Sequence, residues 1–290
     1  MKAYVEIPEQ ARSLVRVRDA LAECAPPTIE ITQDRDAADL VVLHVNGRRD
    51  RSYAQAERAV KRGQKYAVIQ YAVRSTRTPT LSAWAQLWAS AVVTWSYLDL
   101  AGLILPFPWS PYRFHRAPLG VSEAFQSRGD RQRPSTFLAA TSGLSWLTES
   151  VREVALAVQR LRGRVFHLGP NLNRPGVTCQ VGISDAMIAR AFQSCEYVSG
   201  LRRIEGFEMP AAEGLVCGAR PVLFDREHYR HWYGELAEYI EEGDRPSVID
   251  QLEALFRRPI RRVTKAERDE GRQRFDWRQI IEGFWQRCGA

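Results

Sequence analysis

Short apolar runs alternate with amphipathic stretches along most of this 290-residue chain. Leu40–Val45, for example, is a continuous apolar run that ends at the turn pair Asn46-Gly47. Runs of this kind, separated by helices, are typical of parallel strands buried on both faces, so the pattern predicts doubly wound α/β sheets. In the first half we expect strands at Lys2–Ile7, Thr28–Thr32, Leu40–Val45, Tyr66–Tyr71, Ala91–Trp95 and Leu103–Phe107, and helices at Glu9–Glu23 and Tyr53–Arg62.

The alternation is interrupted once and then starts again. Pro106–Pro118 holds four prolines in thirteen residues, which is incompatible with a regular element, and Ser127–Pro134 is a second, polar break. We therefore predict a first domain over residues 1–117, a linker over 118–134, a second domain over 135–270, and a C-terminal helix over 271–290 that packs back toward the first domain. In the second half we expect strands at Thr136–Thr141, Arg164–Leu168, Glu196–Ser199 and Pro221–Phe224, and helices at Trp146–Leu161, Ser184–Gln193 and Pro210–Cys217. A helical tail is expected after Phe224, and it ends in Phe275–Arg287.

Composition excludes several classes of protein. No apolar run approaches the ~20 residues of a membrane span, and Met1–Glu9 lacks the apolar core of a secretory signal. The five cysteines are scattered, which excludes a disulfide scaffold and a paired zinc motif, so we expect a reducing, cytoplasmic location. The formal charge is +7, and residues 40–117 alone hold eleven basic and three acidic side chains. This excess favours a polyanionic partner, although a solvated basic face explains it equally well.

One segment, Tyr197–Asp225, has the order strand, loop, helix, turn, strand. Its loop lies at the carboxyl end of a parallel strand, where open α/β sheets bind their ligands. Pro210 suits the first turn of the helix, whose unpaired N–H groups form an anion site, and Gly218 suits a left-handed helix end. Arg202 and Arg203 could grip a diphosphate, or could be a plain solvated pair. Glu205 and Glu213 would repel a phosphate, so they are expected to bind neutral hydroxyls such as those of sugars.

The same segment resembles the signature of nucleotide-sugar glycosyltransferases of the two-Rossmann GT-B type, specifically retaining family 4. That family carries two glutamates separated by seven residues, within a pattern that ends in Gly-x-Pro-Val. Here Glu205-Gly206-Phe207-Glu208-Met209-Pro210 leads to Glu213, and Cys217-Gly218-Ala219-Arg220-Pro221-Val222 follows. Val181–Asp185 and Phe275-Asp276-Trp277 also resemble family segments. The resemblance implies two Rossmann-like doubly wound domains that face a cleft.

The resemblance also implies roles for individual residues. Glu205 would contact the hydroxyls of the donor sugar, and Glu213 would bind the ribose of the nucleotide. The diphosphate would face the backbone around Gly206, Phe207, Glu208, Met209 and Pro210. His44 ends a buried strand and would touch the sugar or the acceptor, although a packed core histidine explains it equally well.

Two departures from the family pattern affect the phosphate site. Glu208 stands where the family usually has glycine, and the stretch Ser142–Leu147 lacks the usual Arg and Lys. Arg202 and Arg203 are therefore expected to neutralise the diphosphate. The implied reaction is glycosyl transfer to a hydroxyl with retention, from a nucleotide diphosphate sugar, with a UDP-sugar favoured. No metal or other cofactor is expected, because the resembling family requires no metal.

The acceptor is expected to bind the first domain, where the positive charge is concentrated. Arginines that follow the strands, together with nearby aromatic residues, suit phosphate backbones and unstacked bases. We therefore favour a hydroxymethylated base in DNA, as in virus-type DNA-modifying enzymes. Two alternatives remain: a glycan of the envelope or on a lipid, with peripheral contact to an anionic membrane, and a non-catalytic domain of this fold that binds DNA or glycan. The predicted DNA-binding residues are Arg48, Arg49, Arg51, Arg74 and Arg77.

Overall fold

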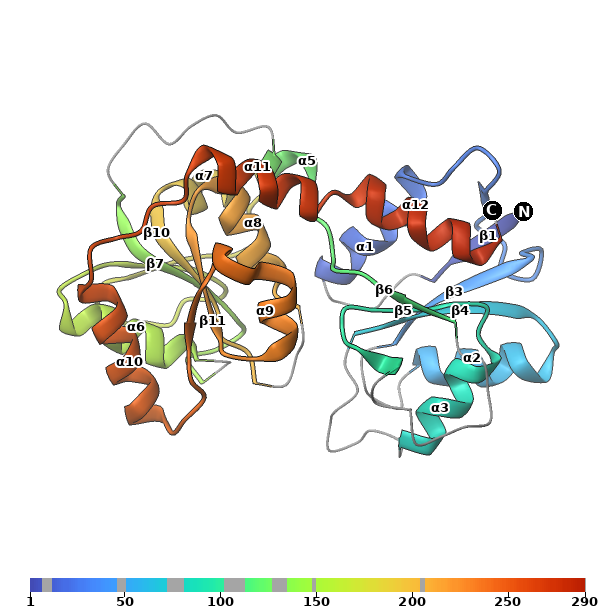
Figure 1. The fold of residues 1–290 in the computed structure, drawn as a ribbon, viewed down its shortest axis with the longest axis horizontal. Helices are drawn as coiled ribbons and strands as arrows, with labels where there is room; N and C mark the ends of the chain where they lie inside the picture. The colour runs from blue at the N-terminus through green and yellow to red at the C-terminus, as the bar shows by residue number, and fades with distance from the viewer. Residues whose placement is uncertain are drawn as a thin grey trace. The chain divides into compact units, whose positions relative to one another are not determined.

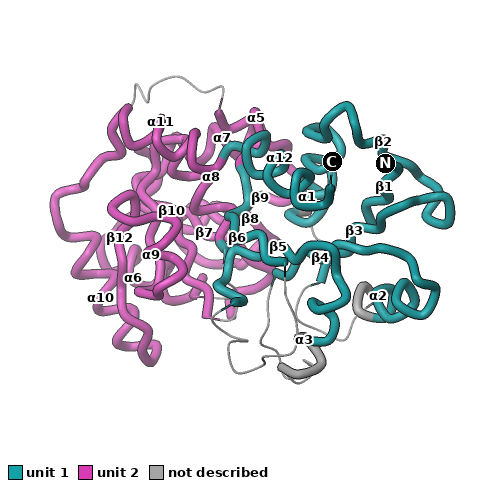
Figure 2. The backbone as a smooth tube through the Cα atoms, turned by 45° about the vertical axis from the view of Figure 1, so that its right-hand side comes forward, with its two compact units in different colours: residues 1–120, 204–207, 276–290 teal, residues 121–203, 208–275 magenta. Residues whose placement is uncertain are grey.

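The computed structural model describes residues 1–6, 12–45, 51–71, 81–101, 113–126, 135–147, 150–203 and 207–289, and of residues 12, 51–53 and 81–85 it describes the backbone only. The chain divides into two compact units, which Figure 2 shows in different colours. The first unit comprises Met1–Gly120, Ile204–Phe207 and Asp276–Ala290, and the second comprises Val121–Arg203 and Glu208–Phe275. The first unit thus takes its last helix from the far end of the chain.

The first unit is built on a parallel sheet whose described strands lie in the order β2-β1-β3-β4-β5-β6. Among the described helices, α1 and α12 cover one face of this sheet, and α2 and α3 cover the other (Figure 1). The strands are β1 (Lys2–Val5), β2 (Glu30–Ile31), β3 (Leu40–Val45), β4 (Lys65–Gln70), β5 (Thr94–Ser96) and β6 (Phe114–Arg116). The helices are α1 (Arg12–Glu23), α2 (Arg51–Lys61), α3 (Leu81–Ser90) and α12 (Trp277–Cys288).

Burial on both faces explains the apolar runs of this unit. All six residues of β3 are buried, and alternate ones, Val41, Leu43 and Val45, pack with side chains of α2. On the other face, Trp285 of α12 donates its indole N–H to the carbonyl of Leu21 in α1, at 3.2 Å. The C-terminal helix is therefore part of the first unit's core.

The second unit also has a parallel sheet, with described strands in the order β12-β11-β10-β7-β8-β9. The chain proceeds outward from β7 in one direction and from β10 in the other, so the strand order reverses between these two neighbours. The strands are β7 (Phe137–Ser142), β8 (Val165–Leu168), β9 (Val177–Gln180), β10 (Cys195–Gly200), β11 (Arg220–Phe224) and β12 (Glu238–Ile240). The helices are α5 (Glu123–Gln126), α6 (Val151–Arg160), α7 (Asp185–Gln193), α8 (Met209–Cys217), α9 (Glu227–Tyr233), α10 (Arg245–Arg257) and α11 (Lys265–Arg274).

Helix α8 packs unusually close to β10 because of a glycine. A Cβ atom added at Gly214 would lie 2.5 Å from Cγ2 of Val198, which is far too close for two carbon atoms. The helix ends at Gly218, whose φ of 94° is the left-handed cap that the sequence predicts. The described residues of α8 are nearly all buried, so its start is held firmly against the carboxyl end of β10.

A fully buried arginine connects the chain after α8 to the following helices. Arg220, at the start of β11, is 0% exposed. Its guanidinium donates to both carboxylate oxygens of Glu267 at 2.8 and 2.9 Å, and to the carbonyls of Leu236, Arg261 and Arg262 at 3.1 to 3.2 Å. This side chain therefore holds β11, the segment before β12 and the start of α11 together.

The prediction of two doubly wound parallel α/β domains is confirmed. One detail of the proline-rich segment is wrong, since Phe114–Arg116 within it forms β6. The prolines before it do not prevent this strand from forming, because Phe114–Arg116 contains no proline. Among the described strands, β6 pairs only with β5, so it lies at the edge of the sheet. The helix expected from Trp146 begins only at Val151, and Leu144 and Leu147 before it are exposed to solvent. The strand expected at Leu103–Phe107 lies outside the described residues.

Among the described elements of the second unit, α5, β9 and β12 were not predicted. Strands of three or four residues carry too little periodicity to be recognised, and pairing with a longer neighbour stabilises them. Among the described residues, no helix is both long enough and apolar enough to cross a bilayer.

Candidate functional site

The reversal of strand order between β7 and β10 locates a candidate site in the second unit. Parallel sheets bind ligands in the crevice outside the carboxyl ends of the strands at such a point, because the two following loops separate there. Here β7 ends at Ser142 and β10 ends at Gly200, and the two strands are hydrogen-bonded neighbours. Arg202 and Glu208, which the sequence singled out, lie in the segment after Gly200 that leads into α8.

The side chain of Arg202 extends from the loop after β10 to the end of β7. Its Nη2 atom donates to the carbonyl oxygen and to Oγ of Ser142, both at 3.2 Å. Its Nε atom lies 3.4 Å from Oε2 of Glu208. A single guanidinium thus joins the end of β7 to the start of α8.

Glu208 lies at the start of α8 as its N-cap residue, but its side chain makes no capping hydrogen bond. The carboxylate turns instead toward Arg202, and the side chain crosses Gly200, where an added Cβ would lie 2.9 Å from Cβ and Cγ of Glu208. Its side chain is only 5% exposed. The carbonyl of Glu208 accepts a hydrogen bond from the hydroxyl of Tyr233 at 2.9 Å, which fixes the backbone at the helix start.

Glu213 lies inside α8 and is 2% exposed. Burial, followed by the negative charges of Glu208 and Glu213, raises the pKa of Tyr233 well above its usual range, so the phenol stays protonated and can donate a hydrogen bond. Pro210 is half-buried in the first turn of α8, and Met209 beside it is buried. The structure therefore brings the predicted residues Arg202, Glu208, Met209, Pro210 and Glu213 together around the start of one helix.

Arg203 points to a different part of the second unit. Its Nη2 atom donates to the carbonyl of Gly243 at 2.9 Å, and its guanidinium lies 5.0 Å from the ring centroid of Phe224. Its own carbonyl accepts a hydrogen bond from Arg226. The two adjacent arginines therefore diverge, and the structure does not place the guanidinium of Arg203 beside that of Arg202.

Phe207 belongs to the first unit, where its ring lies 6.1 Å from that of Tyr97. His44, also in the first unit, is 2% exposed, and its Nδ1 atom is 2.7 Å from the hydroxyl of Tyr71. Burial and the nearby charge of Arg18 lower the pKa of His44 to about 3, so its ring is neutral at physiological pH. Its Nε2 atom is buried and has no hydrogen-bond partner in the described part of the chain.

The remaining predicted residues cannot be placed. Glu205 and Gly206 lie outside the described residues, as do Arg48, Arg49, Arg74 and Arg77. Arg51 begins α2, but its side chain is not described. Two residues that sequence reasoning missed are Ser142, which accepts hydrogen bonds through its carbonyl and hydroxyl, and Tyr233, which donates through its hydroxyl. The position of Ser142 at a strand end was a usable signal, whereas nothing in the sequence pointed to Tyr233.

No family model matches the sequence. The MMP alpha-(1->4)-mannosyltransferase of Mycolicibacterium hassiacum is 26% identical over 219 residues, which cover 65% of this chain and 51% of the relative, so the chain spans about half the length of that relative.

Solved structures show a similar fold at low sequence identity. The sucrose-phosphate synthase of Thermosynechococcus elongatus superposes with a TM-score of 0.67 at 13% identity, covering 97% of this chain and 79% of that one. Anabaena Alr3699/HepE, solved with UDP and glucose, superposes with a TM-score of 0.68 at 9% identity, covering 100% of this chain and 99% of that one. The chain thus has the GT-B fold, with two Rossmann-like domains.

Proposed function

We propose that this chain is a glycosyltransferase that moves a sugar from a nucleotide diphosphate sugar to a hydroxyl group, with retention of the anomeric configuration. One observation carries the proposal: at the strand-order reversal of the second unit, the guanidinium of Arg202 stands between the end of β7 and the start of α8. A cation beside the N-terminus of a helix suits a diphosphate. The mannosyltransferase relative and the fold support the same reaction class.

In this proposal the protein positions the donor and stabilises the leaving group. The bond between the anomeric carbon and the diphosphate breaks, a bond to the acceptor oxygen forms, and the acceptor's proton leaves with the nucleotide diphosphate. Arg202 and the backbone N–H groups at the start of α8 stabilise the charge that develops on the diphosphate. Glu213 binds the ribose, Glu205 binds hydroxyls of the donor sugar, and neutral His44 donates or accepts a hydrogen bond at the sugar.

The carboxylate of Glu208 partly neutralises the guanidinium that the diphosphate would bind. Because its carboxylate pairs with Arg202, a bound diphosphate competes with Glu208 for the same guanidinium. Arg203 makes its contacts elsewhere, so Arg202 takes the main role that the usual basic pair has in the resembling family. We favour a UDP-sugar as donor, since similar structures were solved with UDP bound. We assign the chemistry to these side chains and the backbone, without a resident cofactor.

Two acceptors remain under consideration. A hydroxymethylated base in DNA stays a prediction, because Arg48, Arg49, Arg74 and Arg77 lie outside the described residues. A glycan hydroxyl is favoured by the name of the mannosyltransferase relative. The third possibility, a domain that binds DNA or glycan without catalysis, would bind a donor nucleotide without turning the donor over.

The decisive experiment measures donor binding and turnover with a panel of UDP-, GDP- and ADP-sugars. Calorimetry gives the affinity, nucleotide release gives turnover, and NMR of the product gives the anomeric configuration. Arg202→Gln should weaken donor binding by about 10- to 100-fold, the equivalent of losing a charged hydrogen bond. Arg160→Gln is the matched control, because Arg160 also pairs with acids of the second unit, Asp250 and Glu253, but on α6.

The outcomes separate the alternatives. Binding and turnover that fall with Arg202→Gln but not with Arg160→Gln would support the proposal. Binding without any turnover would support the non-catalytic domain. If no nucleotide sugar bound to the wild-type chain, or if Arg202→Gln bound the donor normally, the proposed site would be wrong.

A further inference from the structure

A small pocket opens in the first unit at the carboxyl ends of β5 and β6, on one face of the sheet. It holds about 60 Å³, which is room for a few water-sized groups such as a hydroxymethyl group or one edge of a sugar ring. Ser96 ends β5 and Arg116 ends β6, and the two residues pair across the strands. The pocket thus lies at the edge where parallel sheets bind ligands, beside a segment that includes Leu98 and Asp99.

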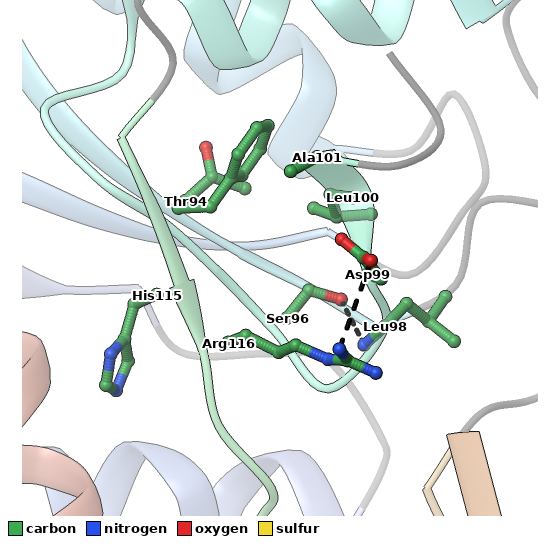
Figure 3. A pocket seen from close by; sticks show the side chains of 9 residues that line it. Thr94, Ser96, Leu98, Asp99, Leu100, Ala101, His115 and Arg116 are labelled. Atoms are coloured by element: carbon green, nitrogen blue, oxygen red, sulfur yellow. Dashed lines mark hydrogen bonds and ion pairs between the residues drawn. The ribbon is translucent and has the colours of Figure 1, made fainter. Parts of the chain in front are cut away.

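The polar side chains that line this pocket include both hydrogen-bond donors and hydrogen-bond acceptors. The carboxylate of Asp99 and the guanidinium of Arg116 stand 3.9 Å apart, and their side chains are 51% and 31% exposed. Figure 3 shows these two side chains converging with that of Ser96. The hydroxyl of Ser96 accepts a hydrogen bond from the backbone N–H of Leu98 at 3.1 Å and can donate its own proton. One wall of the pocket therefore presents a strong acceptor, a forked donor and a hydroxyl together.

The rest of the lining is mostly apolar. The side chains there are Leu98, Leu100, Ala101 and Phe114, together with Thr94. An apolar surface of this kind suits the C–H face of a sugar ring.

Charge decides which class of ligand fits. A phosphate would be repelled by Asp99, and a cation by Arg116, whereas the pair together carries no net charge. Vicinal hydroxyls of a sugar match the Asp99–Arg116 pair, because a hydroxyl can donate to the carboxylate and accept from the guanidinium. The C–H face of the same sugar can pack on Phe114. We propose that this pocket binds the acceptor, and that the acceptor is a neutral carbohydrate.

This inference rests on the proposed glycosyltransferase function and selects one of its two acceptors. A DNA acceptor needs uncompensated positive charge along the phosphate backbone. Here the charge of Arg116 is balanced by Asp99, so the pocket favours a sugar hydroxyl over a base in DNA.

The test uses saturation-transfer NMR with methyl α-D-mannopyranoside and methyl α-D-glucopyranoside, on the full chain. A duplex that contains 5-hydroxymethylcytosine is the rival ligand. Asp99→Asn should weaken glycoside binding about tenfold, because it replaces a charged acceptor with a neutral amide. The control is Asp36→Asn, which removes the same charge from an exposed pair with Arg62 on the same unit and should leave glycoside binding unchanged.

A second variant keeps the test valid if Asp99→Asn fails to fold. Arg116→Gln removes the forked charged donor and leaves the carboxylate of Asp99 in place, and it should also weaken glycoside binding. Saturation transfer that falls with Asp99→Asn or Arg116→Gln, but not with Asp36→Asn, would support the pocket. No transfer to either glycoside in the wild-type chain, normal transfer in the folded variants, or binding of the modified duplex alone would overturn it.

Donor turnover, measured in the same samples, distinguishes the two proposals. If glycosides bind as expected but no nucleotide sugar is turned over, the glycosyltransferase proposal fails and the pocket stands as a carbohydrate site. If donors are turned over but the pocket variants bind glycosides normally, the enzyme stands and this inference fails.

Discussion

Arg220→Met should destabilise the second unit by about 3–5 kcal/mol, the usual effect of leaving one member of a buried ion pair without its partner. The arginine is 0% exposed and lies between Glu267 and three backbone carbonyls. Methionine fills a similar volume but can donate to none of them. The variant therefore leaves a largely buried carboxylate and several carbonyls without their hydrogen bonds.

The pKa of Glu267 provides an independent measure of the same interaction. Burial alone would raise this pKa, but hydrogen bonds from Arg220 and Thr264 outweigh burial and lower it from 4.5 to about 2. Since one pKa unit is about 1.4 kcal/mol, the ionised carboxylate contributes about 3 kcal/mol of stability. Because the folded pKa is the lower one, this contribution is present above about pH 4.5 and is lost as the pH falls toward 2.

Native-state hydrogen exchange is the suitable assay, because amides of β11 and α11 report on the second unit alone, even if the two units do not unfold together. The free-energy gap between wild type and Arg220→Met should be largest near neutral pH and should narrow as the pH falls from about 4.5. The double variant Arg220→Met/Glu267→Gln should recover part of the loss. A loss below about 1 kcal/mol, or a gap that does not change with pH, would refute this reasoning.

Three further predictions concern other residues. Gly214→Ala should destabilise the second unit by about 1–3 kcal/mol, because the new methyl group would overlap Val198, and an unchanged thermal midpoint would contradict the close packing of α8 on β10. Glu213→Ala should weaken the binding of UDP in calorimetry through lost ribose contacts, and normal affinity would remove it from the donor site. If DNA is the acceptor after all, affinity should fall steeply with salt, and replacing Arg48, Arg49 and Arg51 with alanine should flatten that dependence; binding that is independent of salt would count against DNA.

Local sequence patterns were sufficient to predict most of the second unit. Proline in the first turn and glycine just after the last turn define α8, because both residues act through their own backbone geometry. The buried strands β3 and β11 are apolar almost throughout, which is possible only in a sheet covered on both faces. The architecture was therefore predictable, whereas the short strands β6, β9 and β12 depend on their neighbours for stability and could not be recognised alone.

The roles of the two adjacent arginines show what the sequence could not provide. In the sequence, Arg202 and Arg203 are equivalent candidates for one phosphate site. In the structure Arg202 turns to Ser142, sixty residues away along the chain, while Arg203 turns to Gly243. The pairing of β7 with β10 creates this difference, because only the folded sheet brings the end of one strand beside the loop after the other.

The sequence by itself therefore determined where most of the longer strands and helices form. Their positions depend on residues that are near one another in the chain. Only the tertiary structure decided that Glu208 faces Arg202, and that Asp99 and Arg116 meet in one pocket. The physical reason is that side-chain charges interact over a few ångströms of space, and sequence distance does not measure that separation.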